Sequence, residues 1–468
     1  MRTLLALALV AATASPVFAD GDPTIEFERF KLPNGLEVIL APDSSAPLVA
    51  VDVWYHVGSG YEVAGKSGFA HLFEHMMFQG SKNVGEDRHF PILKKLGAEQ
   101  INGTTNTDRT NYYEVVPANQ LETALWLESD RMSHLLELLT PESLHNQIDV
   151  VRNEKRQNYD NRPYTKALFA EYAALFPEGH PYRYLTIGKH EDLVGASVDD
   201  VKKFFRTWYV PANATIAIVG DFDPKTARDL VTKWFGTFPT SQKPTVLHVP
   251  APTVAAKTIE VNDDQFAKLG QIKFAWHSPA NFADGDAELD IAADALTREG
   301  VGRLYKKLRY DKQLAQSVTA SQDGMTFSGV FEITVQLQTG SDVEEVKKIV
   351  TDEVARLTRE NLSADELARV VANNEARMIY GLESVFGKAQ RLEEYNHFLG
   401  APDKITWDLD RYRKTTPDKV RATVARFLSP DHMITIVTTA TARPEGEHRG
   451  HEGHKPHNDD AAHGGGGQ

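Results

Sequence analysis

The chain has 468 residues, with 51 Lys and Arg against 65 Asp and Glu, and a formal net charge of −14. This acidic balance argues against nucleic acid or an anionic membrane surface as the principal partner. Because the chain has no cysteine, it has no disulfide, no cysteine zinc ligand and no thiol nucleophile. Its length is sufficient for two or more domains.

The first 19 residues have the pattern of a secretory signal peptide. Arg2 is positively charged, residues 4–14 form a short apolar core, and Val17-Phe18-Ala19 resembles a cleavage site. The apolar run is too short to span a membrane, and no later run reaches about 18 apolar residues. The sequence therefore predicts export to the bacterial periplasm and no integral membrane segment after cleavage. An uncleaved anchor is the alternative.

Residues 24–60 alternate and turn as strands do. One strand is predicted over residues 36–40, after the turn Pro33-Asn34-Gly35, and another over residues 48–57. An amphipathic helix is predicted next, over about residues 68–80.

This helix contains the sequence His71-Leu72-Phe73-Glu74-His75. Histidines at i and i+4 lie on one helix face, where two neutral imidazoles can bind one zinc ion. Such a pair leaves coordination positions for a third ligand and a water molecule, and Glu74 is close enough to act on that water as a base. The pentapeptide by itself leaves a second interpretation open, in which the two histidines make an ordinary polar contact.

The chain continues with a polar, threonine-rich segment, residues 102–107, and a strand over residues 111–116. Two helices are predicted after it, over residues 121–139 and from Pro141 to about Asn158. The second helix has a favourable start, because Thr140 can cap it, Pro141 suits its first position and Glu142 lies in its first turn.

An internal repeat relates the two halves of the chain. Residues 198–211 and the strand 216–219 resemble residues 416–430 and the strand 434–437. Residues 139–144 likewise resemble residues 362–367. Two resemblances in the same order favour duplication over chance. The sequence therefore predicts an α+β fold of two homologous sheet-and-helix domains, each of about 200 residues.

The predicted N-terminal metal-bearing domain covers residues 20–240, a proline-rich linker covers 241–254, and the C-terminal domain covers 255–441. The second domain has no histidine pair in the matching region, residues 286–304, so one half carries the metal. Residues 442–468 are rich in histidine and glycine and are predicted to be a disordered tail. Loose zinc binding by this tail and a solvated tail without such a function both remain open.

A peptidase zinc site needs a third protein ligand, and Glu154, in Val150-Val151-Arg152-Asn153-Glu154, is the leading candidate. Here the chain resembles the pitrilysin family of zinc peptidases, which combines H-x-x-E-H with a later glutamate in such a context. The resemblance is of the short-chain type and extends over nearly all of the chain after the signal peptide. Further matches occur in the family's order, at Asn102-Gly103-Thr104-Thr105, His180-Pro181-Tyr182, Ile187-Gly188 and residues 302–309.

The resemblance implies one Zn²⁺ per chain, with His71, His75 and Glu154 as ligands and Glu74 as general base for a zinc-activated water. It implies an endopeptidase that cleaves peptides or unfolded segments. Asn102 would belong to a sheet edge that an extended peptide joins, and Arg309 would bind substrate. The chain would form half of a clam-like chamber, as a homodimer or a heterodimer with a related chain.

Two positions depart from the family pattern. Gln147 occupies a position where a second glutamate is frequent, which should affect the tuning of the site more than metal binding. Gln316 stands seven residues after Arg309, where a tyrosine is frequent, so a donor near the transition-state oxygen is missing. This departure favours a heterodimer whose partner supplies the Arg and the Tyr. The alternative function is a zinc-binding or scaffold subunit with little activity alone.

Overall fold

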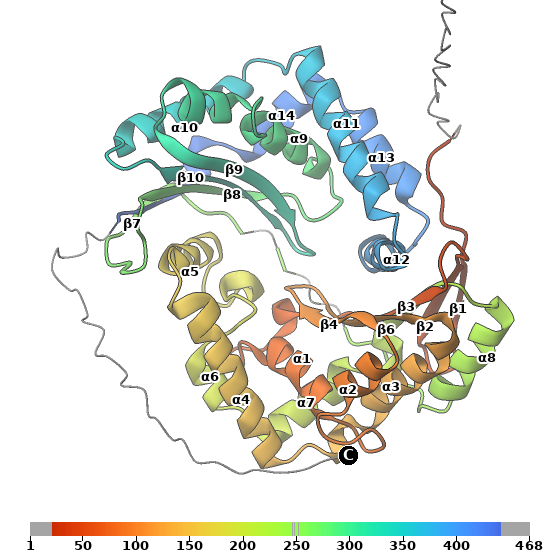
Figure 1. The fold of residues 1–468 in the computed structure, drawn as a ribbon. Coiled ribbons are helices and arrows are strands. Elements are labelled where there is room, and N and C mark those ends of the chain that lie inside the picture. Colours follow the sequence, from red (N-terminus) through yellow and green to blue (C-terminus); the bar gives the residue numbers. More distant parts are fainter. Residues whose placement is uncertain (1–20, 246, 248, 251, 441–468) are drawn as a thin grey trace, which may run out of the picture.

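The computed structural model describes residues 21–245, 247, 249–250 and 252–440 (Figure 1). The predicted signal peptide and histidine-rich tail lie outside these residues, as do three positions of the predicted linker. Across the described ranges, every helix is too short or too polar to cross a lipid bilayer.

The first half contains a mixed sheet of six strands in the order β1-β2-β6-β3-β5-β4. Strands β2 and β6 are parallel, and the other pairs are antiparallel. Strand β4 is the last in the strand order and is therefore an edge strand. The strands are β1 (Glu28–Lys31), β2 (Glu37–Pro42), β3 (Leu48–Tyr55), β4 (Glu99–Thr105), β5 (Thr110–Pro117) and β6 (Ala214–Gly220). The helices are α1 (Phe69–Gln79), α2 (His89–Lys95), α3 (Leu121–His134), α4 (Pro141–Lys155), α5 (Thr165–Leu175), α6 (His190–Val194), α7 (Val198–Trp208) and α8 (Pro224–Phe235).

The second half contains a sheet of five strands in the order β7-β11-β8-β10-β9. The strands are β7 (Lys257–Val261), β8 (Gln271–Ser278), β9 (Ala315–Gly324), β10 (Gly329–Leu337) and β11 (Ile434–Thr438). The helices are α9 (Asp286–Thr297), α10 (Val343–Leu357), α11 (Ala364–Gly381), α12 (Val385–Leu399), α13 (Ile405–Arg413) and α14 (Pro417–Phe427).

Apart from the additional strand β1 of the first sheet, the two sheets have the same topology. In chain order, β7, β8, β9, β10 and β11 take the places of β2, β3, β4, β5 and β6, and the parallel pair β7–β11 matches the parallel pair β2–β6. The predicted α+β class with two related halves is therefore confirmed. The repeat seen in the sequence corresponds to helices α7 and α14 with strands β6 and β11, and to helices α4 and α11.

Two elements differ from the sequence prediction. The threonine-rich segment, which the sequence pattern did not predict as a strand and only the family resemblance placed at a sheet edge, is strand β4, because its β-branched residues pair with β5. The helix predicted over residues 121–139 ends at His134 and is followed by a short 3₁₀ turn, Leu135–Glu137. The polypeptide there turns back into α4, which runs beside α1.

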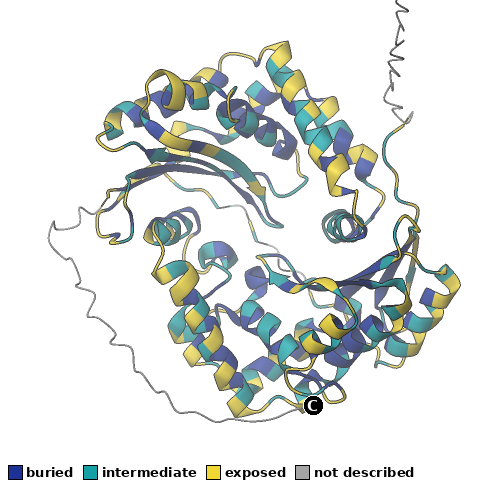
Figure 2. Ribbon diagram, viewed as in Figure 1, coloured by how far each residue is buried: buried dark blue, intermediate teal, exposed yellow. Residues whose placement is uncertain are grey.

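Each sheet is covered on one face by helices of its own half and on the other by a helix of the other half (Figures 1 and 2). In β6, Ile216 and Ile218 face the core beneath α1, α3 and α7, whereas Ala217 and Val219 pack against α12. The alternation follows from the period of two in a strand. Both faces are thus buried, which explains why β6 is apolar except at Thr215.

The two halves exchange helices: α12 of the second half packs against the first sheet, and α5 of the first half packs against β7, β8 and β11 of the second. Ala167 and Leu175 of α5 share a buried cluster with Ala275, Ile434 and Ile436. Helices α5 and α12 follow α4 and α11, so they occupy matching places in the repeat. This exchange of helices holds the two halves together. The sequence pattern does not predict it.

A buried ion cluster fixes α5 to the second sheet. Lys273 Nζ of β8 lies 2.5 Å from Glu171 Oε2 of α5 and 2.6 Å from Glu332 Oε2 of β10. Glu171 is fully buried and Lys273 nearly so. Removing the lysine would leave two carboxylates close together in a low-dielectric interior.

We therefore expect Lys273→Met to lower the free energy of unfolding by about 3–5 kcal/mol, measured by urea denaturation. The matched control is Lys225→Met, because Lys225 also pairs with a carboxylate, Asp229, but on the exposed surface of α8. Exposed pairs contribute little, so the control should unfold near the wild-type midpoint. Equal midpoints for the two variants would contradict the structural importance of the buried cluster.

Candidate metal centre

The start of α1 is held by a carboxylate and two glycines. Glu62 accepts hydrogen bonds from the backbone N–H groups of Gly68 (2.9 Å) and Ala70 (2.8 Å), two donors that have no partner within the helix. Gly68 has a φ of 89° and lies so close to Gly188 that a Cβ on Gly188 would come within 2.5 Å of its backbone. Glycine at position 188, which matches the family pattern at Ile187-Gly188, therefore allows the close packing that positions the helix with the two histidines.

The start of α4 follows the sequence prediction. Thr140 is the N-cap, Pro141 is the first helical residue and Glu142 lies in the first turn. Ser143 completes a reciprocal capping arrangement, because its backbone N–H donates to Thr140 Oγ1 while its hydroxyl accepts from the Thr140 N–H. The cap sets where α4 begins, and Glu154 lies at its far end.

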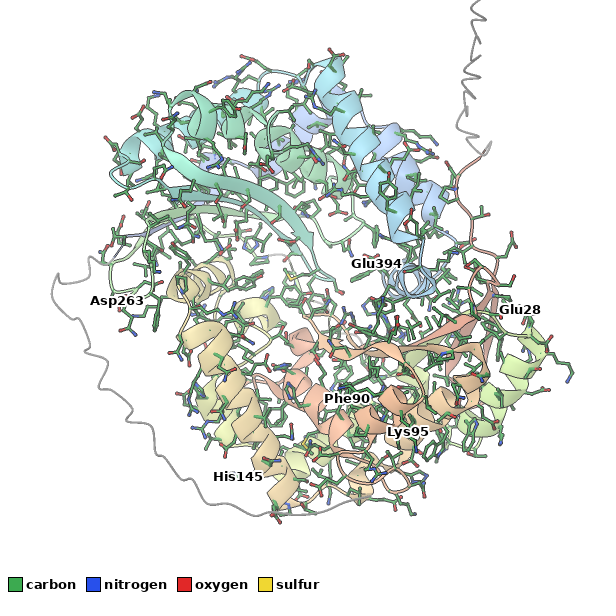
Figure 3. All side chains as sticks on the ribbon, viewed as in Figure 1. Glu28, Phe90, Lys95, His145, Asp263 and Glu394 are labelled. Atoms are coloured by element: carbon green, nitrogen blue, oxygen red, sulfur yellow. The ribbon has the colours of Figure 1, made fainter. Side chains whose placement is uncertain are left out.

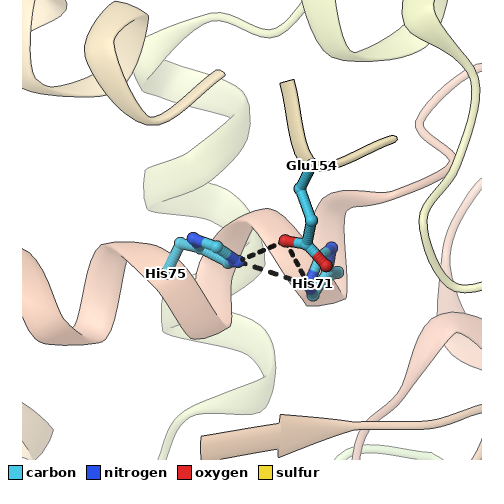
Figure 4. A group of neighbouring side chains, drawn as sticks. All are labelled: His71, His75 and Glu154. Atoms are coloured by element: carbon cyan, nitrogen blue, oxygen red, sulfur yellow. Dashed lines mark hydrogen bonds and ion pairs between the residues drawn. The ribbon is translucent and has the colours of Figure 1, made fainter. Parts of the chain in front are cut away.

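His71 and His75 on α1 and Glu154 on α4 point toward one another (Figure 4). The two Nε2 atoms are 3.3 Å apart, and Glu154 Oε2 lies 3.6 Å from the Nε2 of His71 and 3.2 Å from that of His75. Ligands held about 2.0–2.1 Å from a tetrahedral zinc are separated by about 3.3 Å. The nitrogen and oxygen donors therefore fit a zinc ion in both spacing and chemistry.

The electrostatics of His71 and Glu154 also suit a metal. Burial lowers the pKa of His71 to about 4, so this imidazole is neutral at pH 7, as a metal ligand must be. The pKa of Glu154 is lowered, chiefly by its hydrogen bond with His75, so this group is a carboxylate at neutral pH.

Glu74 lies beside these ligands. Burial raises the pKa of its carboxyl, while a 2.6 Å hydrogen bond from Thr105 Oγ1 and the neighbouring His75 act in the opposite direction. A carboxylate whose pKa is moved toward neutrality is a better proton acceptor at pH 7. The sequence does not suggest the contact with Thr105, because 31 positions separate the two residues.

A pocket of about 570 Å³ lies at the edge strand β4 and is lined by the three candidate ligands and Glu74. Asn102 and Gln147 both border it, so the structure brings these two sequence-predicted positions to the candidate metal centre. Its complete lining is His71, Glu74, His75, Phe78, Gln79, Asp87, Phe90, Asn102, Gly103, Gln147, Val150 and Glu154. The aromatic wall formed by Phe78 and Phe90 was not predicted, although Phe78 follows Glu74 by one helical turn and could have been inferred.

Arg309 lies elsewhere in the same chain. It belongs to a π-helical segment, Tyr305–Asp311, and borders a separate pocket with Tyr310, Gln313 and Gln338. Its guanidinium donates to the backbone oxygen of Gln316. The structure therefore brings Arg309 and Gln316 to each other but places Arg309 in a different pocket from the His71 group.

A second group of possible ligands, His89, Glu114 and Glu128, is buried in the first half. Glu128 is already paired with Arg131, whose Nε donates to it over 2.8 Å and whose guanidinium stacks on Tyr112. A cation at this group would lie beside a buried guanidinium, which is unfavourable. The His71 group has no comparable cation among its described ion-pair partners, so it is the better metal site.

Comparison with known proteins identifies the family. The model described as "Insulinase (Peptidase family M16)" matches residues 37–182, and that described as "Peptidase M16 inactive domain" matches residues 195–374. The chain belongs to peptidase family M16. The first match includes both histidines, Glu74 and Glu154, and the second lies largely in the half that has no histidine pair.

Similar M16 proteins are named as zinc proteases. The zinc protease PqqE of Helicobacter pylori is 28% identical over 79% of this chain and 83% of its own length. The uncharacterized zinc protease YmxG of Bacillus subtilis is 21% identical over 89% of this chain and 99% of its own length. Both span most of this chain.

Solved structures have the same fold. A protease from Helicobacter pylori has a TM-score of 0.83 at 24% identity, covering 89% of this chain and 100% of that one. The periplasmic protease PqqL of Escherichia coli has a TM-score of 0.75 at 17% identity, covering 90% of this chain but 48% of its own. PqqL is therefore about twice as long as the part that matches.

The site geometry predicts that the purified chain, truncated before the histidine-rich tail, binds about one zinc ion. His75→Ala and Glu154→Gln should each lose most of it, because two ligands hold zinc far more weakly than three. The measurement is metal content by mass spectrometry after dialysis.

His145→Ala is the matched control, since His145 is an exposed histidine near the opposite end of α4 (Figure 3). This variant should keep its zinc. Equal zinc content in His75→Ala and His145→Ala would exclude the proposed ligand set.

Proposed function

We propose that this M16 protein is a zinc-dependent endopeptidase, with one zinc ion held by His71, His75 and Glu154 and with Glu74 as general base. The observation that carries the proposal is the donor geometry, in which separations of 3.2–3.6 Å join two imidazole nitrogens and a carboxylate oxygen. The zinc proteases among its relatives support the choice of metal.

When bound, zinc supplies a positive charge that makes a water molecule more acidic and polarises a peptide carbonyl. Glu74 accepts a proton from that water while the water oxygen bonds to the carbonyl carbon of the peptide. Glu74 then passes the proton to the nitrogen of the departing amine as the peptide C–N bond breaks. One proton is taken and one is returned, so Glu74 is a carboxylate again at the end of the cycle.

The substrate is a peptide or an unfolded segment of a protein. Strand β4 is the edge of the first sheet, and Asn102 and Gly103 of β4 border the pocket of the metal centre. An extended peptide can add to such an edge through its backbone, which would lay a peptide bond beside the pocket whatever its side chains are. Asn102 is accordingly assigned to substrate binding.

Glu74→Gln should keep its zinc and lose about 10²- to 10⁴-fold in kcat, because an amide cannot accept the proton. The assay is cleavage of a quenched fluorescent peptide, with and without a chelator. Glu178→Gln, at an exposed carboxylate, is the control and should cleave as the wild type does. A Glu74→Gln variant that binds zinc and cleaves at the wild-type rate would disprove the mechanism.

The active assembly is proposed to be a dimer. Arg309 and the metal centre border different pockets of one chain, and PqqL joins about twice the matched length in one chain. A second copy, or a related chain, would then supply the Arg309 position to each metal centre. The truncated chain should elute from gel filtration as a dimer if two copies suffice.

Mixing inactive variants tests this assembly. If Arg309 acts across a homodimer, Glu74→Gln and Arg309→Ala chains mixed under exchange conditions should regain about a quarter of wild-type activity, since random pairing leaves that share of sites intact. Recovery above the sum of the two separate preparations is the measurement. No recovery from exchanged dimers would show that Arg309 does not act in trans.

A scaffold or zinc-binding subunit with little activity alone is the second candidate function. It is favoured by Gln316, which cannot replace a tyrosine hydroxyl beside the transition-state oxygen. Full turnover by the purified single chain would exclude this candidate. The first 19 residues support a proposed periplasmic location, which cell fractionation would test.

A further inference from the structure

Resting on the proposed function of Glu74, we propose that Thr105 is a positioning residue for the general base. Its hydroxyl donates to Glu74 Oε2 over 2.6 Å, from the edge strand β4 to the motif helix α1. This contact holds one carboxylate oxygen in place and leaves Oε1 to take the proton. The strand proposed to bind the peptide would thereby also orient the base that cleaves it.

The single hydroxyl proton of Thr105 has two possible acceptors, Glu74 Oε2 at 2.6 Å and Thr110 Oγ1 at 3.3 Å. The proton of Thr110 is directed to the backbone oxygen of Val57 over 2.9 Å. A carboxylate is the stronger acceptor and is also much closer. The Thr105 proton is therefore committed to Glu74.

The backbone of β4 also approaches Glu74 closely at Gly103. A Cβ at position 103 would lie 3.1 Å from Glu74 Cγ and 2.9 Å from Phe78 Cε2. Gly103 and Thr105 are two positions apart and lie on the same face of the strand. The Glu74 side chain is thus confined by the strand backbone at one residue and bonded to a hydroxyl at the other.

The position of Thr105 is set independently of Glu74 by the β4–β5 hairpin. Arg109 donates to the backbone oxygen of Thr104 over 2.8 Å, and Thr104 Oγ1 donates to Asn111 Oδ1 over 2.6 Å. Asn111 donates in turn to buried Asp52, which also accepts from Gln390 of α12. A rigid strand therefore presents the hydroxyl, and the exchanged helix of the second half braces that strand.

Thr105→Val tests the inference, because valine keeps the shape and the β-propensity while it removes the hydroxyl. We expect kcat to fall about 10- to 100-fold, the effect of losing one hydrogen bond to a charged group. KM should stay within about threefold, and zinc content should be unchanged. Thr105→Ser should recover most of kcat, and a crystal structure of Thr105→Val should show the Glu74 carboxylate displaced.

Thr104→Val is the matched control. It removes a hydroxyl from the adjacent residue of the same strand. This hydroxyl bonds to Asn111 and Arg109 and not to Glu74, and the bond from Arg109 to the backbone oxygen of Thr104 remains to hold the strand. Damage to the strand as a peptide-binding edge should appear mainly in KM. An equal loss of kcat in Thr104→Val and Thr105→Val would overturn the inference, because it would assign the effect to the strand as a whole.

A double-mutant cycle separates this inference from the proposed function. In a Glu74→Gln background, adding Thr105→Val should cause little further loss, since the base to be positioned is already gone. An unchanged kcat in Thr105→Val, with a large loss in Glu74→Gln, would overturn the inference alone. Equal activity of Glu74→Gln and wild type would overturn the proposed function and the positioning by Thr105 together.

Discussion

The packing of α4 against α1 is the contact on which the candidate site depends. Two histidines one helical turn apart place two donors on one face of α1, and a third donor must come from another element. Helix α4 supplies it because its capped start and its course beside α1 bring Glu154 to 3.2 Å from His75. Displacing α4 by even about one ångström would change both separations between Glu154 and the histidines, which make the set suitable for zinc.

Around this contact, the proposed site draws on three elements. Helix α1 would supply two ligands and the base, α4 would supply the third ligand, and β4 provides an edge together with the hydroxyl that meets Glu74. The elements are not independent, because β4 approaches Glu74 at Gly103 and Thr105. A change in the edge strand is therefore also a change at the Glu74 carboxylate.

The two halves of the chain are related in topology and unequal in chemistry. The second sheet repeats the strand order of the first, yet α9, which takes the place of α1, has no histidine pair. Within one chain the second half supports the first, since α12 covers the other face of the first sheet and donates through Gln390 to Asp52.

The sequence by itself determined the motif, the capped start of α4, the duplication and the α+β class, because these follow from local spacing and periodicity. His71, Glu74 and His75 are neighbours in the chain, and helical geometry alone places them together. Glu154 required a resemblance to known peptidases, since no local rule joins two helices. Only the tertiary structure decided that Thr105 donates to Glu74 and that Arg309 borders a different pocket from the candidate metal centre. It also decided that α5 and α12 each pack against the sheet of the other half. These depend on strand register and on packing between segments far apart in sequence, which periodicity does not encode.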